Sequence, residues 1–302
     1  MRKVMLAMVL LLLVSFGLSA ADRLDSLFEK ADSLYEEEKY EEVAEVLKQA
    51  EPLAKSNTEK AGFYWRQARS VLNLADEAER NGASSDALLA EFEQGEALAQ
   101  KAVELNPSDH NGYYWRASNV GRWGQTKGIL NSLMKAAPMR DDLEIAVRKN
   151  PNHADSFYVL GMLYASVPKF ISFGNVEWAV SYSRRALDAY DGDKTKYSYY
   201  LKLGEHLQQR DWSASKRKRE AGGFESSYRS ATDPVEKYRY FEGDFDFDAA
   251  QPYSPRGVAK LSDEEEAIQI MEWLVDELGA IRNPTSGEKD NLEDARTHLA
   301  EW

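Results

Sequence analysis

The sequence predicts an all-α protein, an α-solenoid of stacked helix pairs that ends in a capping helix. Apolar residues recur every three to four positions, as at Leu143, Ala146 and Val147, which is the period of one helix face. Pro151 has no backbone N–H and cannot continue this helix, so a turn must follow at Asn150-Pro151. The six-residue pattern A-V-x-x-N-P occurs twice, at residues 102–107 and 146–151.

A second repeated segment supports the same architecture. Gly62-Phe-Tyr-Trp-Arg66 and Gly112-Tyr-Tyr-Trp-Arg116 open two successive predicted helices, and the Asn-Pro turns close two others. Such a pattern is typical of tetratricopeptide repeats, although the repeats here are longer than the standard 34 residues. Gly161 lies within a predicted helix, where glycine costs about 1 kcal/mol relative to alanine. We therefore expect Gly161, and Gly204 in the same position of the next pair, to admit a closely packed neighbour.

The helix pairs follow in order along the chain. The first is expected at residues 22–56, the second at 60–105, the third at 111–149 and the fourth at 154–189, and residues 194–208 open a fifth. Helical periodicity is lost between residues 209 and 257, which predicts an irregular surface segment. The basic run Lys216–Arg219 within it is expected to be a solvated loop or an intramolecular partner for acidic side chains. Ser262 and Glu265 form a capping-box pattern that opens the C-terminal capping helices of residues 258–302. The solenoid itself is expected over residues 22–208.

The N-terminal 21 residues have the pattern of a secretory signal peptide. Arg2 and Lys3 precede an apolar run from Val4 to Val14, and small residues follow up to Ala21. The run is short for a membrane span, so an uncleaved anchor is the less favoured alternative. We expect an exported protein that is soluble after cleavage and keeps no stable membrane span.

Composition excludes several classes of function. The chain has no cysteine, and therefore no disulfide, thiolate chemistry or lipidated N-terminal cysteine. Its formal net charge of −13 disfavours nucleic acid and anionic lipid as partners. The four histidines are not at zinc-ligand spacing, and the sequence contains no phosphate loop, dinucleotide fingerprint or nucleophile elbow. We therefore predict a protein that is not an enzyme and holds no metal or cofactor.

The candidate binding residues are aromatic and basic, and they lie near two predicted connections between helices, residues 121–128 and 166–175. Both connections should reach the same edge of the solenoid and could line a cleft. Aromatic rings would supply apolar area there, and the cations could bind a carboxylate. The alternative is that the aromatic rings are core packing between helices. The candidates are Trp115, Arg122, Trp123, Lys127 and Phe173.

Around these residues the chain resembles the T component of TRAP-associated transporters (the TatT family) of exported, tetratricopeptide-like proteins. The resemblance rests on Gly121-Arg-Trp-Gly124, Ala137-Pro138, the turn at Asn150-Pro151 with the Leu160-Gly161-x-x-Tyr164 pattern after it, and Ser172-Phe-Gly174, and it covers residues 62–204. The regulator-of-microtubule-dynamics proteins look like distant relatives of that family. The resemblance to the transporter component implies a periplasmic location, a solute-binding protein as partner, an apolar or carboxylate ligand, and homo-oligomers. The absence of cysteine departs from that family, whose members are typically tethered by a lipidated cysteine.

Two functions are compatible with these expectations. The first is a non-catalytic accessory component of TRAP-type solute uptake, which requires Arg122, Trp123 and Phe173 to surround a cavity. The second is a general envelope scaffold that binds a peptide in its concave groove, in which case all three side chains could be buried packing.

Overall fold

The computed structural model describes residues 19–242 and 260–302. The regular structure within these ranges is entirely helical, which confirms the predicted all-α class. None of the helices in the described ranges is long and apolar enough to cross a membrane. The apolar run expected to be a signal peptide lies outside the described residues.

The chain divides into two compact units at residues 55 and 56. In the first unit, α1 (Ala20–Glu36) begins at a capping box formed by Ser19 and Asp22. It packs against α2 (Tyr40–Ala50), which continues into a short 3-10 helix, η1 (Glu51–Leu53). The two helices bury one apolar face each, and these faces form the core of the unit.

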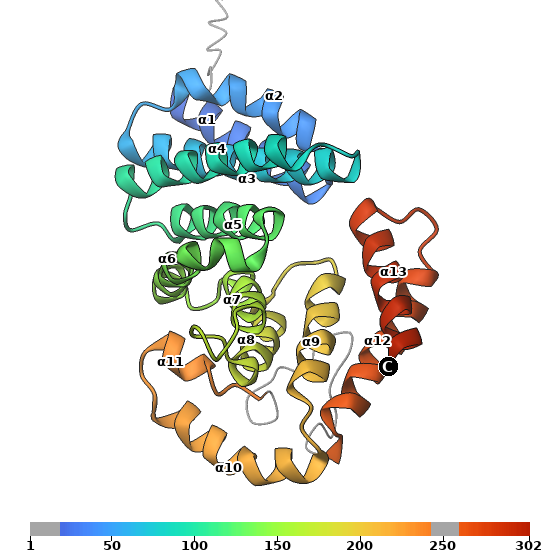
Figure 1. The fold of residues 1–302 in the computed structure, drawn as a ribbon. Helices are drawn as coiled ribbons and strands as arrows, with labels where there is room; N and C mark the ends of the chain where they lie inside the picture. The colour runs from blue at the N-terminus through green and yellow to red at the C-terminus, as the bar shows by residue number, and fades with distance from the viewer. Residues whose placement is uncertain (1–18, 243–259) are drawn as a thin grey trace, which may run out of the picture. The chain divides into compact units, whose positions relative to one another are not determined.

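The second unit is a stack of helix pairs, coloured from cyan to yellow in Figure 1. Each helix packs against the next in the chain, which confirms the predicted solenoid. The helices are α3 (Asn57–Arg80), α4 (Ser85–Leu105), α5 (His110–Lys127), α6 (Ile129–Lys149), α7 (Ala154–Ser166), α8 (Val176–Ala189) and α9 (Tyr197–Arg210).

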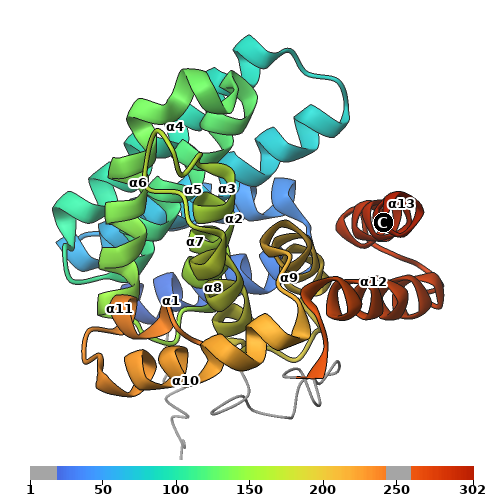
Figure 2. The same ribbon diagram turned by 60° about the horizontal axis from the view of Figure 1, so that its bottom comes forward.

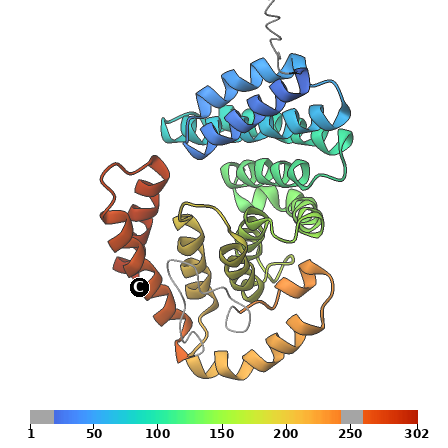
Figure 3. The same ribbon diagram turned by 180° about the vertical axis from the view of Figure 1, so that it is seen from behind.

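The C-terminal part adds four helices to the second unit: α10 (Ala214–Ser230), α11 (Pro234–Tyr238), α12 (Asp263–Gly279) and α13 (Ser286–Glu301). The α12–α13 hairpin packs against α9 as a terminal cap (Figures 1 and 3). The expectation of irregular structure at residues 209–257 has to be corrected, because α10 and α11 lie within it. Periodicity did not indicate α10 because this helix buries only Arg217 and Tyr228. Residues 243–259 lie outside the described ranges.

Two helix crossings have the close approach that the glycines predicted. A Cβ atom on Gly161 of α7 would lie 2.9 Å from Ser183 Oγ and 3.2 Å from the carbonyl oxygen of Ala179, both on α8. A Cβ atom on Gly204 of α9 would collide with Met271 of α12. The expected role of both glycines is confirmed.

A third close approach fixes the crossing of α3, α4 and α5. Asn119 of α5 is fully buried, and its side-chain amide donates hydrogen bonds to the carbonyl oxygens of Ala68 (3.3 Å) and Trp115 (2.8 Å). A Cβ atom on Gly95 of α4 would overlap the Asn119 side chain. Because these hydrogen bonds hold Asn119 in place, α4 can pack here only with glycine.

We expect Gly95→Ala to destabilise the protein by about 1–3 kcal/mol, because the added methyl group overpacks a buried site. Gly222→Ala in α10 is the matched control. Nothing lies within 4 Å of a Cβ atom at that position, so the free energy of unfolding should rise by about 0.5–1 kcal/mol. Urea unfolding of the three proteins measures both effects, and a loss of stability in both variants would contradict the role assigned to Gly95.

Candidate functional site

The predicted connection at residues 121–128 is helical up to Lys127. Gly121 and Gly124 lie within α5, where a Cβ atom would come within 2.8 Å of Met139 Cε and 3.2 Å of Ser132 Oγ, both on α6. The turn itself is made by Gly128, at a φ of +90°. The two helical glycines therefore serve the close packing of α5 on α6, and they do not form a loop.

Two of the candidate residues are structural. Trp115 is buried, and its ring contacts that of Tyr114 edge-on. Arg122 binds Asp76 (2.7 Å) and Glu79 on α3, so its guanidinium joins α5 to α3. The guanidinium of Arg122 thus donates its hydrogen bonds within the fold. Trp115 is part of the packing between helices, as the alternative interpretation of the aromatic residues expected.

Trp123 and Phe173 are each partly buried beneath a cation of α6. The Trp123 indole N–H donates to Glu93 Oε1 (3.0 Å), and Lys135 Nζ lies 4.5 Å from the centre of the indole ring. The Phe173 ring packs edge-on against Tyr164, and the Arg140 guanidinium lies 4.7 Å from its centre. Both aromatic rings thus stack with a cation from the same helix.

These two pairs lie on different sides of α6. Lys135 and Arg140 are five positions apart, which places them about 140° apart around a helix with 3.6 residues per turn. Trp123 and Phe173 are therefore separated by the body of α6. The expectation that both rings line one cleft is not supported by this arrangement.

The outward face of α6 lies between the two pairs and is apolar. Leu130 and Met134 are 72% and 93% exposed, and Pro138 continues the stripe one turn later. The loop between α7 and α8 lies beside α6, as the stacking of Arg140 on Phe173 requires (Figures 1 and 2). Phe170 and Ile171 in this loop are 87% and 51% exposed.

Leu130, Met134, Phe170 and Ile171 form what we call the α6 edge. They are the exposed large hydrophobic side chains within the described ranges. Phe170 and Ile171 lie in the predicted connection 166–175, but of that connection only Phe173 was named as a candidate. Leu130 and Met134 were missed because an apolar residue at helical spacing is expected in the core, and spacing alone does not show which one remains exposed. Lys127, the remaining sequence candidate, is exposed where α5 meets α6.

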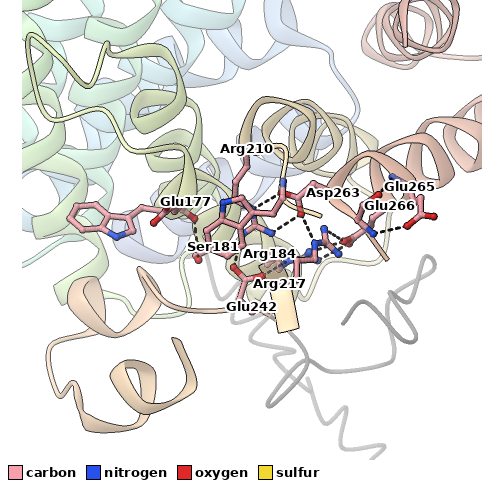
Figure 4. Close-up of polar contacts among 12 residues, drawn as sticks. Glu177, Ser181, Arg184, Arg210, Arg217, Glu242, Asp263, Glu265 and Glu266 are labelled. Carbon is pink, nitrogen blue, oxygen red and sulfur yellow. Dashed lines mark hydrogen bonds and ion pairs between the residues drawn. The ribbon is translucent and has the colours of Figure 1, made fainter. Parts of the chain in front are cut away.

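A buried cluster of charged side chains joins four helices of the C-terminal half (Figure 4). Arg184 of α8 donates two hydrogen bonds of 2.8 Å to Glu266 of α12, and both side chains are fully buried. Arg210 of α9 binds Asp263 of α12 through bonds of 2.8 and 2.9 Å. Arg217 of α10 contacts both carboxylates. Sequence reasoning missed this cluster because its members are up to 82 residues apart.

The cluster is electrically balanced. Glu242 is its third carboxylate and lies 2.6 Å from Arg210, so three arginines face three carboxylates. Burial alone would raise the pKa of the Asp263 carboxyl, but the hydrogen bonds and charges of Arg210 and Arg217 outweigh burial and hold that pKa below its usual value. A carboxylate that stays ionised and fully paired is a poor proton donor or acceptor. The cluster therefore serves as a clamp between helices.

Comparison with known proteins relates the N-terminal half of the chain to one family. The family model described as "Regulator of microtubule dynamics protein 1-3" matches residues 27–170. Regulator of microtubule dynamics protein 1 of Bos taurus is 30% identical over 141 residues, which are 46% of this chain and 41% of the relative. The protein of the same name from Pongo abelii is 25% identical over 143 residues, 47% of this chain and 43% of the relative. The chain thus spans less than half the length of these relatives.

These matches correct the expectations drawn from the transporter resemblance. The related proteins are named for microtubule dynamics and come from two mammals, so the assignment to the T component of TRAP-associated transporters is wrong. The expectations that depended on this assignment are wrong as well. They are the solute-binding partner, the role in transport, the periplasmic location and the alternative of an envelope scaffold. The comparisons instead find the regulators of microtubule dynamics, which were expected only as distant relatives of the transporter component.

We expect Arg184→Met to destabilise the protein by about 3–5 kcal/mol, because it leaves a buried carboxylate without its main counter-charge. Arg219→Met is the matched control, since Arg219 is an exposed residue of α10 paired with Glu220, and its loss should change stability by less than about 0.5 kcal/mol. Urea unfolding compares the two variants. Equal losses would show that the cluster is not the clamp inferred here.

His206 of α9 predicts a pH dependence of stability. It is buried, its Nδ1 lies 2.8 Å from Ser183 Oγ, and burial lowers its pKa from 6.5 to about 3. Between these values the unfolded chain binds one proton more than the folded chain, so folding is weakened as the pH falls below 6.5. We expect a contribution of about 1.4 kcal/mol per pH unit in this range. His206→Gln should reduce the slope of unfolding free energy against pH by that amount, and parallel slopes would contradict the prediction.

Proposed function

We propose that this chain is a non-catalytic binding module that acts in the regulation of microtubule dynamics, the process after which its relatives are named. The match of residues 27–170 to that family carries the proposal. The match extends over helices α1 to α7 and ends at Phe170. It includes most of the paired helices, whose extended surfaces in repeat proteins typically bind partners.

The chemistry of the described residues favours binding over catalysis. His153 and His206 are kept neutral at physiological pH because burial lowers their pKa values to about 4 and about 3. The buried arginines and carboxylates of the C-terminal half neutralise one another. A catalytic acid or base needs a pKa near the working pH and access to a substrate, and these groups lack both.

The proposal is tested by following single microtubules grown from purified tubulin, with and without the full chain. We expect the chain to change the growth rate or the frequency of switching to shrinkage, with no effect on the rate of nucleotide hydrolysis per tubulin added. An unrelated protein of similar size and net charge is the control, because a net charge of −13 could itself perturb a charged polymer. Microtubules that grow and shrink alike with the chain and with the control would rule out this function for the chain acting alone.

A further inference from the structure

We propose that the α6 edge docks the protein on the surface of an anionic lipid bilayer, with the tip of the α7–α8 loop inserted among the lipid headgroups. This inference goes beyond the proposed function and does not depend on it. It rests on the exposure of the α6 edge and on the exposed lysines that lie beside it.

The apolar side chains of the α6 edge protrude from the protein surface. Met134 is 93% exposed and Phe170 is 87% exposed, so little of the surrounding protein covers either one. Residues that line a groove are partly covered by its walls, and a protein partner would need a matching cavity for each of them. A bilayer interface accepts protruding apolar side chains without such a match. Leu130 and Ile171 extend the apolar surface on the helix and on the loop.

The charge around the α6 edge is opposite to that of the whole chain. Residues 110–140 and 156–176 contain lysine and arginine but no aspartate or glutamate, although the second part of α6 carries Asp141, Asp142 and Glu144 and the first turn of α7 carries Asp155. Lys127 is exposed at the end of α5, one turn before Leu130, and Lys169 is exposed next to Phe170. Basic residues beside apolar ones are the combination that binds anionic lipid surfaces.

Carboxylates from neighbouring elements do not reverse this charge. Glu93 accepts the hydrogen bond of the Trp123 indole, and Glu96 binds Lys135 (2.6 Å). Asp141 is exposed on the same face of α6 as Leu130 and Met134, and its carboxylate is paired with Arg140 (2.6 Å). At physiological salt, charges farther than about 8 Å from a surface are largely screened. The acidic side chains behind the net charge of −13 therefore repel an anionic bilayer less when the α6 edge faces it than when another face does.

The absence of cysteine allows a test with a single probe. An environment-sensitive fluorophore is attached to the full chain through Ile171→Cys at the loop tip, or through Ser215→Cys on an exposed part of α10 as control. Vesicles of phosphatidylcholine with phosphatidylserine should shift the emission at position 171 to shorter wavelength and leave that at position 215 unchanged. Vesicles of phosphatidylcholine alone should give a smaller shift at position 171.

Variants that carry the same label measure the apolar and the electrostatic contribution to membrane binding separately. Phe170→Ser should lower the partition coefficient about tenfold, because a large apolar side chain no longer leaves water. Replacing Lys127 and Lys169 by glutamine should lower it about fivefold for each lysine removed. The same replacement of Lys60 and Lys218, which are exposed on α3 and α10, is the control and should have little effect.

Three results would overturn the proposal. The first is an unchanged emission at position 171 while the chain sediments with the vesicles, which would mean that another part, such as the apolar run Val4–Val14, binds the lipid. The second is no sedimentation with vesicles of either composition. The third is a shift that grows with protein concentration in the absence of lipid, which would assign the α6 edge to contact between two copies of the chain. The microtubule assay contains no lipid, so the two proposals can fail separately.

Discussion

Six charged side chains, five of them buried and Glu242 partly exposed, hold the C-terminal half of this protein together. Arg184, Arg210 and Arg217 come from three successive helices, and two of their partners, Asp263 and Glu266, lie in the first turn of α12. Removing such charges from water is costly, and the cost is offset only when nearly every donor and acceptor is satisfied. The cluster therefore fixes the helices in one arrangement, because a displaced helix would leave a buried charge unpaired.

The helices before α8 depend on a different constraint, the close approach of backbones at small residues. Gly95, Gly121 and Gly161 each lie where a neighbouring helix leaves little or no room for a side chain. Close packing of this kind excludes water and is rigid, which leaves the outward face of α6 as a fixed surface. The helix that carries the apolar side chains of this face is held in position by its close packing on α5 at Gly121.

The features predicted correctly from the sequence are those that depend on residues close together in the chain. Helical spacing and the two Asn-Pro turns predicted the solenoid, and the cost of glycine within a helix indicated close packing at Gly161. Gly121 and Gly124 obey the same rule, but the glycines around Trp123 resembled a loop and were assigned to a connection. A glycine can break a helix or let another helix approach, and only the position of α6 distinguishes the two. The α10 helix and the charged cluster depend on partners distant in sequence, and the exposure of Met134 and Phe170 depends on which faces remain uncovered.

The separation of the cluster's residues along the chain also has a consequence for biosynthesis. A protein leaves the ribosome from its N-terminus, so Arg184, Arg210 and Arg217 emerge long before the carboxylates of Asp263 and Glu266. Until then Glu242 is the one carboxylate of the cluster that these three arginines can pair with, so their charges are not balanced and the cluster cannot close. The helices of residues 57–149 do not depend on Asp263 and Glu266, because each packs mainly on its neighbour in the chain. The arrangement of the C-terminal half can therefore be completed only after residues 263 and 266 have been made.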